Sequence, residues 1–540
     1  MQITIRNQKI SGEAILVAIV ASTGGFLFGY DTGQISGILI MPDFMRRFAT
    51  CSDVNDVSTC AFNTWIEGLI VAFLSIGTAM GALMGAKIAE VLGRRKAMSV
   101  ECAVVAIGTL IQVVSFHAWY QVAIGRLVTG LGIGALSAAV PLYQAETAPK
   151  VIRGTLTATY QLMITFGILL AALINLGTHS MKNSGSWRIT VSLNILFSIM
   201  LGIGIMFCPE SPRWLLQQGR TEQARASITH VYGKGPEAEI LIEGEFKDIS
   251  RVVAEEQALS PVGWSDIFVI RNKTLYRTLL GMTLQMFQQL TGANYFFYYG
   301  ATIFQGVGLT SPYVTQTILN SVNFVCTFFG MYIMERFGRR NPLIIGGIWQ
   351  GCWMIVFATV GTTKDPTTDK HAAQVLIISG CMFILGYAST WAPGIWILIG
   401  ETFANRTRPR QGAMSTFSNW VWNFLLAFFT TPIVNNISFK YGYVFGGANL
   451  AGAVIVFFFL YESSDLTLEA VDLMYNDPNV RPWTSGKWAP PGYANRHDFA
   501  KVANSAPGDE MTMVGSGSDS DGPNGPKSNK KLVAQGIERA

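Results

Sequence analysis

Long apolar runs separated by short polar loops are the feature of this sequence that most restricts its fold. A helix needs about 20 apolar residues to cross roughly 30 Å of hydrocarbon, and runs of this length recur along the chain. Only 14% of the 540 residues are charged, against roughly a quarter in soluble proteins. We expect spans near residues 14–40, 62–86, 97–116, 120–143, 154–177, 187–208, 275–300, 313–334, 342–361, 372–400, 409–434 and 440–461. The sequence therefore predicts an all-α membrane protein with twelve transmembrane helices.

Polar segments divide the chain and set its orientation. Lys and Arg are more frequent in the loops on the side of the N-terminus than in the opposite loops, which predicts that both termini are cytoplasmic. A Gly-, Ser-, Asp- and Pro-rich composition predicts disorder from about residue 506. The predicted units are an N-terminal tail (1–13), a six-helix bundle (14–208), a cytoplasmic linker with short helices (209–274), a second bundle (275–461) and a C-terminal tail (462–540).

Charged landmarks of the first half recur in the second half in the same order. The recurring pairs are Gly93-Arg94-Arg95 and Gly338-Arg339-Arg340, Glu146 with Arg153 and Glu401 with Arg408, and Glu210-Ser211 and Glu462-Ser463, at offsets of 245, 255 and 252 residues. This order indicates two homologous, pseudo-symmetric six-helix halves. Folds of this kind bind their substrate near the bilayer midplane, between halves that rock to expose it alternately.

The composition argues against several other classes of function. Seven cysteines and five histidines are scattered without metal-binding spacing, so we expect no metal. A net charge of +5 without a basic domain gives no reason to expect nucleic-acid binding. No nucleophile–base set stands out, so we expect no enzyme, and no obligate protein partner is implied.

Asp31 and Arg126 place opposite charges inside predicted spans. With 1.5 Å of rise per residue and spans running in opposite directions, both side chains fall at similar depth in the outer half. A lone charge in a membrane costs roughly 2.5–3.5 kcal/mol, so an ion pair is expected. Either Asp31 is a protonatable switch, whose protonation releases Arg126 and lets the halves move, or the pair is purely structural.

A second charged set lies at the predicted cytoplasmic ends of the spans. Its arginines can bond carboxylates and helix C-terminal carbonyls, and would tie the halves together when the protein faces outward. The alternative is that these basic residues only fix the orientation of the chain in the membrane. The set comprises Arg94, Arg95, Glu146, Arg153, Glu210, Arg213, Glu335, Arg339, Arg340, Glu401, Arg408 and Glu462.

Uncharged polar side chains inside apolar spans form a third set. Amides both donate and accept hydrogen bonds, as sugar hydroxyls do, and need partners when buried. Each amide alone is more often a contact between helices, but together they describe a site for a neutral polyol, against which Trp396 and Trp420 could stack. The amides are Gln161, Gln288, Gln289, Asn294, Asn323, Asn419 and Asn423.

Outside the spans, Cys51 and Cys60 lie in one polar loop and form either a disulfide or two free thiols.

Six segments resemble the sugar porter branch of the major facilitator superfamily over about residues 14–475. These are GRLVTGLGIGALSAAVPLYQAE, RGTLTATYQLMITFG, PESPRWLL, QQLTGANYFFYYG, ERFGRR and WAPGIWILIGETF. The segments PESPRWLLQQGR and YESSDLTLEAVDLMY are similar to fungal hexose or pentose transporters. Two positions depart from the family: Tyr461-Glu462-Ser463-Ser464-Asp465 lacks the proline and lysine of the closing motif, and Ala388 replaces a glutamate of some animal facilitators.

The resemblance implies a role for each matching residue. It places sugar contacts at Gln161, Gln288, Gln289, Asn294, Asn323, Trp396, Asn419 and Trp420, an outer gate at Tyr298 and Tyr299, and proton coupling at Asp31 with Arg126. We expect transport of a monosaccharide, glucose, another hexose or xylose, across the plasma membrane by proton symport, with no other cofactor. A facilitative uniporter and a non-transporting sugar sensor are the alternatives.

Overall fold

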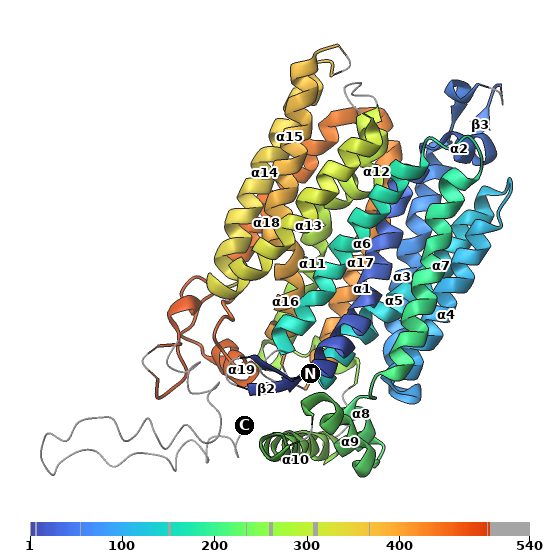
Figure 1. Cartoon of the computed structure of the whole chain (residues 1–540). Helices are drawn as coiled ribbons and strands as arrows, with labels where there is room; N and C mark the ends of the chain where they lie inside the picture. The colour runs from blue at the N-terminus through green and yellow to red at the C-terminus, as the bar shows by residue number, and fades with distance from the viewer. Residues whose placement is uncertain are drawn as a thin grey trace, which may run out of the picture.

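Helices long enough to cross a bilayer make up most of the computed structural model (Figure 1). It describes residues 2–5, 8–53, 56–149, 153–233, 235–258, 263–305, 311–366, 368–404, 406–493 and 495–496. Within these ranges, ten helical stretches are long and apolar enough to span a membrane. The predicted disorder from about residue 506 lies outside the described residues.

The first half packs through small residues that let helix backbones approach closely. A Cβ atom added at Gly77 or Gly81 would lie 2.1 Å from a carbonyl oxygen of the facing helix, so only glycine allows this approach. Gly77 and Gly81 belong to α3, and the facing helix is α5. The helices are α1 (Gly12–Ile38), α3 (Thr64–Leu92), α4 (Arg94–Val113), α5 (Trp119–Thr147), α6 (Arg153–Thr178) and α7 (Gly185–Gly204), followed by η2 (Ile205–Phe207).

The second half contains two departures from regular α-helix. The predicted span 275–300 is broken into two helices at Thr291 and Gly292, where Gly292 has φ +94°. The predicted span 372–400 contains a π-helical turn, η5 (Tyr387–Trp391). The helices are α11 (Thr274–Leu290), α12 (Ala293–Gln305), α13 (Pro312–Arg336), α14 (Arg340–Thr363), α15 (Lys370–Gly386), α16 (Ala392–Thr402), α17 (Arg408–Ile437) and α18 (Tyr441–Phe459), with η6 (Ser438–Lys440) between the last two.

One face of the molecule, here called the linker side, carries the segment between the halves (Figure 1). Ile228 and Val231 of this segment pack on Ala14 and Ala18 of α1. The N-terminal tail forms a hairpin on this side, which the sequence did not suggest. The elements are β1 (Gln2–Ile5), β2 (Gln8–Ser11), α8 (Pro212–Gln217), α9 (Thr221–Tyr232), α10 (Pro236–Ala258), η3 (Ser265–Phe268), η4 (Arg271–Lys273), α19 (Leu468–Asn476) and η7 (Ser485–Lys487).

The opposite face, here called the loop side, carries a disulfide-closed loop (Figure 1). Its elements are α2 (Pro42–Phe48), β3 (Thr50–Cys51), η1 (Val57–Thr59) and β4 (Cys60–Ala61). Cys51 and Cys60 form a disulfide, and the Trp187 indole N–H donates to Asp43 of α2 at 3.0 Å. Phe44 of this loop and Ile70 of α3 share one apolar cluster with Tyr298 of the second half. The loop side is therefore closed in this structure.

Candidate functional site

Buried amides converge where α11 ends and meets α17. Gln289 Nε2 donates to Asn419 Oδ1 at 3.0 Å, and Gln289 Oε1 accepts from Asn294 at 2.5 Å and from Asn423 at 3.2 Å. Asn294 joins this group because the break at Gly292 starts α12 beside the end of α11. Discontinuous helices of this kind are typical of substrate sites in secondary transporters.

Two further glutamines extend the network along α11. Asn419 Nδ2 donates to Gln288 Oε1 at 2.9 Å and to Gln285 Oε1 at 2.5 Å. Gln288 Nε2 also donates to the carbonyl of Trp391 at 3.1 Å. Gln285 was missed by the sequence reasoning, although it lies one turn before Gln288 and Gln289 on the same face. Its Nε2 is buried and has no hydrogen-bond acceptor among the described residues.

Other predicted sugar contacts lie apart from this network. Asn323 of α13 is buried, and its Oδ1 has no donor in the described part of the chain. Trp420 is buried next to Asn419 and packs edge-on against Phe28 of α1, with ring centroids 5.5 Å apart. Gln161 of α6 is half-buried, and Trp396 of α16 is 39% exposed. Within the described residues, no hydrogen bond joins these four side chains to the amides around Gln289.

Asp31 and Arg126 meet inside the first half. Arg126 Nη1 lies 3.6 Å from Asp31 Oδ2, and the two side chains are 1% and 0% exposed. Gln34 and Asn194 donate to Asp31 Oδ1 at 2.7 and 3.2 Å. These two amides were not predicted, although Gln34 lies one turn after Asp31 on α1. A buried charge pair of this kind depends on such additional hydrogen bonds because desolvation of both ions is expensive.

Asn423 links the amide network to the first half. Ser75 of α3 donates to Asn423 Oδ1 at 2.5 Å, and the Tyr298 hydroxyl donates to the same oxygen at 3.1 Å. The second predicted gate residue, Tyr299, donates to the carbonyl of Ala427 at 2.5 Å. One amide oxygen therefore joins the network, a predicted gate tyrosine and a serine of the opposite half.

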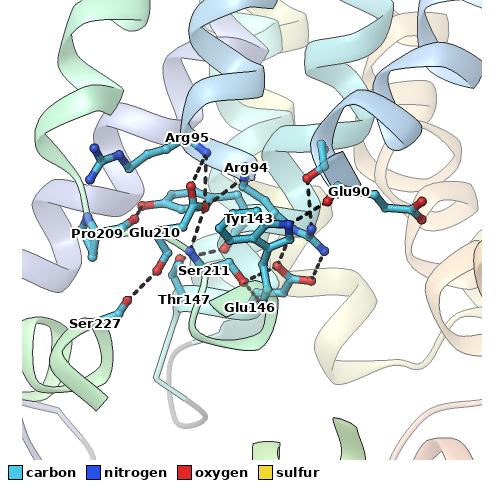
Figure 2. Close-up of polar contacts among 12 residues, drawn as sticks. Glu90, Arg94, Arg95, Tyr143, Glu146, Thr147, Pro209, Glu210, Ser211 and Ser227 are labelled. Carbon is cyan, nitrogen blue, oxygen red and sulfur yellow. Dashed lines mark hydrogen bonds and ion pairs between the residues drawn. The ribbon is translucent and has the colours of Figure 1, made fainter. Parts of the chain in front are cut away.

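A charged cluster holds the linker side of the first half together (Figure 2). Arg94 donates twice to Glu146, at 2.9 Å from both Nε and Nη2. Glu210 accepts from the backbone N–H groups of Arg94 and Arg95, at 3.0 and 3.3 Å. Ser211 adds a hydrogen bond to Glu146 at 2.5 Å. The cluster therefore joins α4, α5 and the start of the linker.

The second half repeats this cluster. Arg339 donates to Glu401 at 3.0 and 2.7 Å, Glu462 accepts from the backbone of Arg339 and Arg340 at 3.0 Å each, and Ser463 donates to Glu401 at 2.7 Å. Burial alone would lower the pKa of the Arg339 guanidinium, but Glu401 and Glu462 outweigh it, so the pKa is raised and the group stays charged. Arg94 pairs with Glu146 inside the first half, and Arg339 pairs with Glu401 inside the second.

The remaining members of the predicted cytoplasmic set have separate positions. Arg408 donates to the carbonyl of Phe403 at 3.0 Å, and Arg213 of α8 is half-buried. Glu335 at the end of α13 is exposed. The side chain of Arg153 lies outside the described residues.

Comparison with known proteins places this architecture in a family. A family model for sugar (and other) transporters matches residues 17–475. The chain belongs to this family. It is 43% identical over 479 residues to the high-affinity glucose transporter ght2 of Schizosaccharomyces pombe, covering 88% of this chain and 89% of that protein. It is 39% identical over 481 residues to the low-affinity glucose transporter HXT3 of Saccharomyces cerevisiae, covering 88% and 84%.

Solved structures identify the fold. The chain is similar to the partially occluded inward open conformation of the xylose transporter XylE from E. coli, with a TM-score of 0.69 and 22% identity over 84% of this chain and 99% of that one. The family resemblance predicted from the sequence is confirmed. The protein is a multi-pass membrane transporter with the major facilitator fold, not an enzyme.

Proposed function

We propose that this protein transports monosaccharides, with a preference for hexoses, across the plasma membrane by alternating access. We propose that the transport is symport with protons. Relatives named as high-affinity glucose and fructose transporters, 43% and 41% identical, support a hexose as the substrate. The observation that carries the proposal is the amide network around Gln289.

The network matches the chemistry of a neutral polyol. Each amide both donates and accepts, so a ring of hydroxyls can replace the amide–amide bonds without leaving a buried polar atom unpaired. The Nε2 group of Gln285 has no acceptor among the described residues, so it is available to donate to a sugar hydroxyl. The network contains no charged side chain, which suits an uncharged substrate.

We propose that twelve helices form two six-helix bundles related by pseudo-symmetry, with the linker and both termini in the cytoplasm. The ten spanning stretches support this arrangement, because the stretch Arg408–Phe459 contains two helices, α17 and α18, and α11 with α12 supplies one broken span. The repeated charged clusters support the relation between the halves. In the present structure, closure of the loop side agrees with an inward-facing state.

Proton coupling is assigned to Asp31. Neutralising Asp31 removes the charge that balances Arg126, which then needs another partner or solvent. Ile35 and Val122, each one turn from a member of the pair, share an apolar cluster with Tyr298, which bonds Asn423, so a shift of the pair reaches the amide network through this packing. This connection gives protonation a route to the site and to the gate.

The test is hexose uptake by the purified chain in proteoliposomes with an imposed proton gradient. We expect accumulation of D-glucose above equilibrium, abolished by a protonophore. Asp31→Asn, which keeps an amide for Gln34 and Asn194, should lose accumulation and retain exchange. Accumulation that survives in Asp31→Asn refutes the assigned role, and uptake indifferent to the gradient makes the protein a uniporter. If no hexose is taken up under any gradient, the proposed function itself is wrong.

A further inference from the structure

A cavity of about 350 Å³ lies on the loop side, apart from the amide network. Its wall combines Glu67 near the start of α3 with Tyr295 and Tyr299 of α12, Thr431 and Asn435 of α17, and Phe439 of η6. The volume falls within the range of roughly 300–1,000 Å³ that is typical of small-molecule sites. The cavity is therefore large enough for a ligand of monosaccharide size.

Glu67 is the unusual group in this wall. Its side chain is only 9% exposed and lines the cavity, and its carboxylate oxygens are not among the buried polar atoms sealed without a partner in the described residues, so they are open to the cavity. It lines the same cavity as Tyr299 of α12, so the side chain lies on the wall where α3 faces α12. A carboxyl group buried without a partner is expensive, so a native structure that keeps one usually supplies its partner from a ligand or solvent.

The rest of the wall favours an uncharged polyol over a metal ion. No group of three or more His, Cys, Asp or Glu side chains arranged to hold a metal occurs in the described ranges. The second carboxylate at the cavity, Asp365, is exposed, whereas Thr431 and Asn435 offer neutral hydroxyl and amide groups. Tyr295 and Phe439 add aromatic surface, which packs well against the C–H face of a sugar ring.

We propose that this cavity is a second, loop-side binding site for a hexose, in which the Glu67 carboxylate accepts hydrogen bonds from sugar hydroxyls. Charge-assisted bonds of this kind are stronger than bonds between neutral groups. The identity of the polyol as a hexose rests on the proposed function. The site itself rests on the cavity and on the buried, unpartnered Glu67.

The site spans the seam between the halves. Glu67 belongs to the first half, whereas the other wall residues named above belong to the second, and the next residue, Gly68, packs directly on the Phe428 carbonyl of α17. The complete site therefore exists only while the loop side is closed. A hexose bound there stabilises the closed state and delays reopening. Uptake should consequently fall at high sugar concentration on the loop side.

Binding stoichiometry tests the proposal on the full chain in nanodiscs. With D-glucose as the probe, we expect two molecules bound per chain in the wild type and one in Glu67→Gln or Thr431→Val. Gln289→Ala should instead retain the loop-side molecule. Glu90→Gln, an exposed acid on the same helix, is the matched control and should bind two.

Uptake in proteoliposomes supplies the second readout. In the wild type, we expect high glucose on the loop side to reduce the uptake rate to about half of its maximum. Glu67→Gln should keep the wild-type rate at low glucose and should lose this inhibition at high glucose. A wild type that binds one glucose, or a Glu67→Gln variant that still binds two, overturns the second site and leaves the transport function intact. Binding that follows Na⁺ instead of glucose also overturns it. Absence of all uptake would instead refute the transport function.

Discussion

Gln285 shows how one buried amide adds to the affinity of a site. It accepts from Asn419 at 2.5 Å, and its Nε2 has no acceptor among the described residues. A substrate hydroxyl that satisfies this donor contributes about 1–1.5 kcal/mol, which corresponds to roughly tenfold in affinity. The residue is therefore placed to strengthen substrate binding.

We predict that Gln285→Ala raises the apparent KM for D-glucose about tenfold and leaves the maximal rate nearly unchanged. The measurement is concentration-dependent uptake in proteoliposomes. Gln121→Ala is the control, because the Gln121 side chain at the loop end of α5 donates to the Ile111 carbonyl, away from the network, and its loss should leave KM unchanged. An unaltered KM in Gln285→Ala would remove Gln285 from the site.

Sequence reasoning at this scale found the amides that stand out and missed those that do not. Gln288, Gln289 and Asn419 could be selected because polar side chains are rare in apolar spans. Ser75 and Asn194 could not, since a serine or asparagine on a helix does not reveal which distant helix it faces. The exposure of Trp396 was equally hidden, because it depends on how the second-half helices are arranged.

At the scale of elements, the break between α11 and α12 positions the amide network. Gly292 has φ +94°, a conformation that favours glycine, and a Cβ atom there would lie 2.8 Å from the Phe445 ring. The segment 275–300 contains no proline that would mark the break in the sequence. The break was therefore not predicted, because a single glycine inside an apolar span is common.

We predict that Gly292→Ala lowers hexose uptake at least tenfold and destabilises the protein by about 1–3 kcal/mol, since the backbone must strain or the break must close. Uptake and thermal unfolding in detergent are the two measurements. Gly447→Ala in α18, where an added Cβ meets nothing within 4 Å, is the control. Equal effects of the two substitutions would show that the break has no special role.

A hydrogen bond between α3 and α17 connects closure of the loop side to the site. Ser75 reaches across the seam to the same Asn423 whose Nδ2 bonds Gln289. We predict that Ser75→Ala weakens this closure by about 1 kcal/mol, so the open loop side becomes roughly fivefold more populated. Ser137→Ala, which loses only a bond to its own helix, should not change it.

The measurement is the labelling rate of a cysteine placed at Ile70, which is fully buried in the loop-side cluster, in a background without the free cysteines. An impermeant maleimide should react several times faster in the Ser75→Ala background. Unchanged labelling in both backgrounds would show that Ser75 does not hold the loop side closed.

At the scale of the molecule, the family, the helical membrane fold and the class of function could be predicted from the sequence. The length of an apolar run indicates directly that a helix is buried in lipid, and repeats such as Gly93-Arg94-Arg95 and Gly338-Arg339-Arg340 can be recognised as short sequence motifs. Contacts between residues far apart in the sequence produce no such motif. The cavity beside Glu67 and the folded part of the C-terminal tail therefore emerge only from the structure.

Residues 462–493, with 495 and 496, form a folded cap under the second half, not merely a tail. Arg277 of α11 is fully buried, lies 2.6 Å from Asp472 and stacks on the Tyr475 ring. Arg496 donates to the carbonyls of Trp488, Ser464 and Ser485. Burial lowers the pKa of the Arg496 guanidinium, and the nearby Glu462 carboxylate opposes this effect. The charged form of Arg496 is therefore stabilised by Glu462 and by these carbonyl acceptors.

Truncation separates the cap from the remaining tail. A chain ending at residue 496 keeps every one of these contacts, and we predict wild-type uptake and stability. A chain ending at residue 461 removes Asp472 and Tyr475 from Arg277 and Glu462 from the charged cluster, and we predict a loss of about 1.5–3 kcal/mol for the charge-assisted bond to Asp472 alone. Asp472→Asn in the full chain should reproduce part of this loss, and thermal unfolding measures all three. If the chain ending at residue 461 were as stable as the full chain, the cap would be an appendage that adds nothing to the stability of the second half.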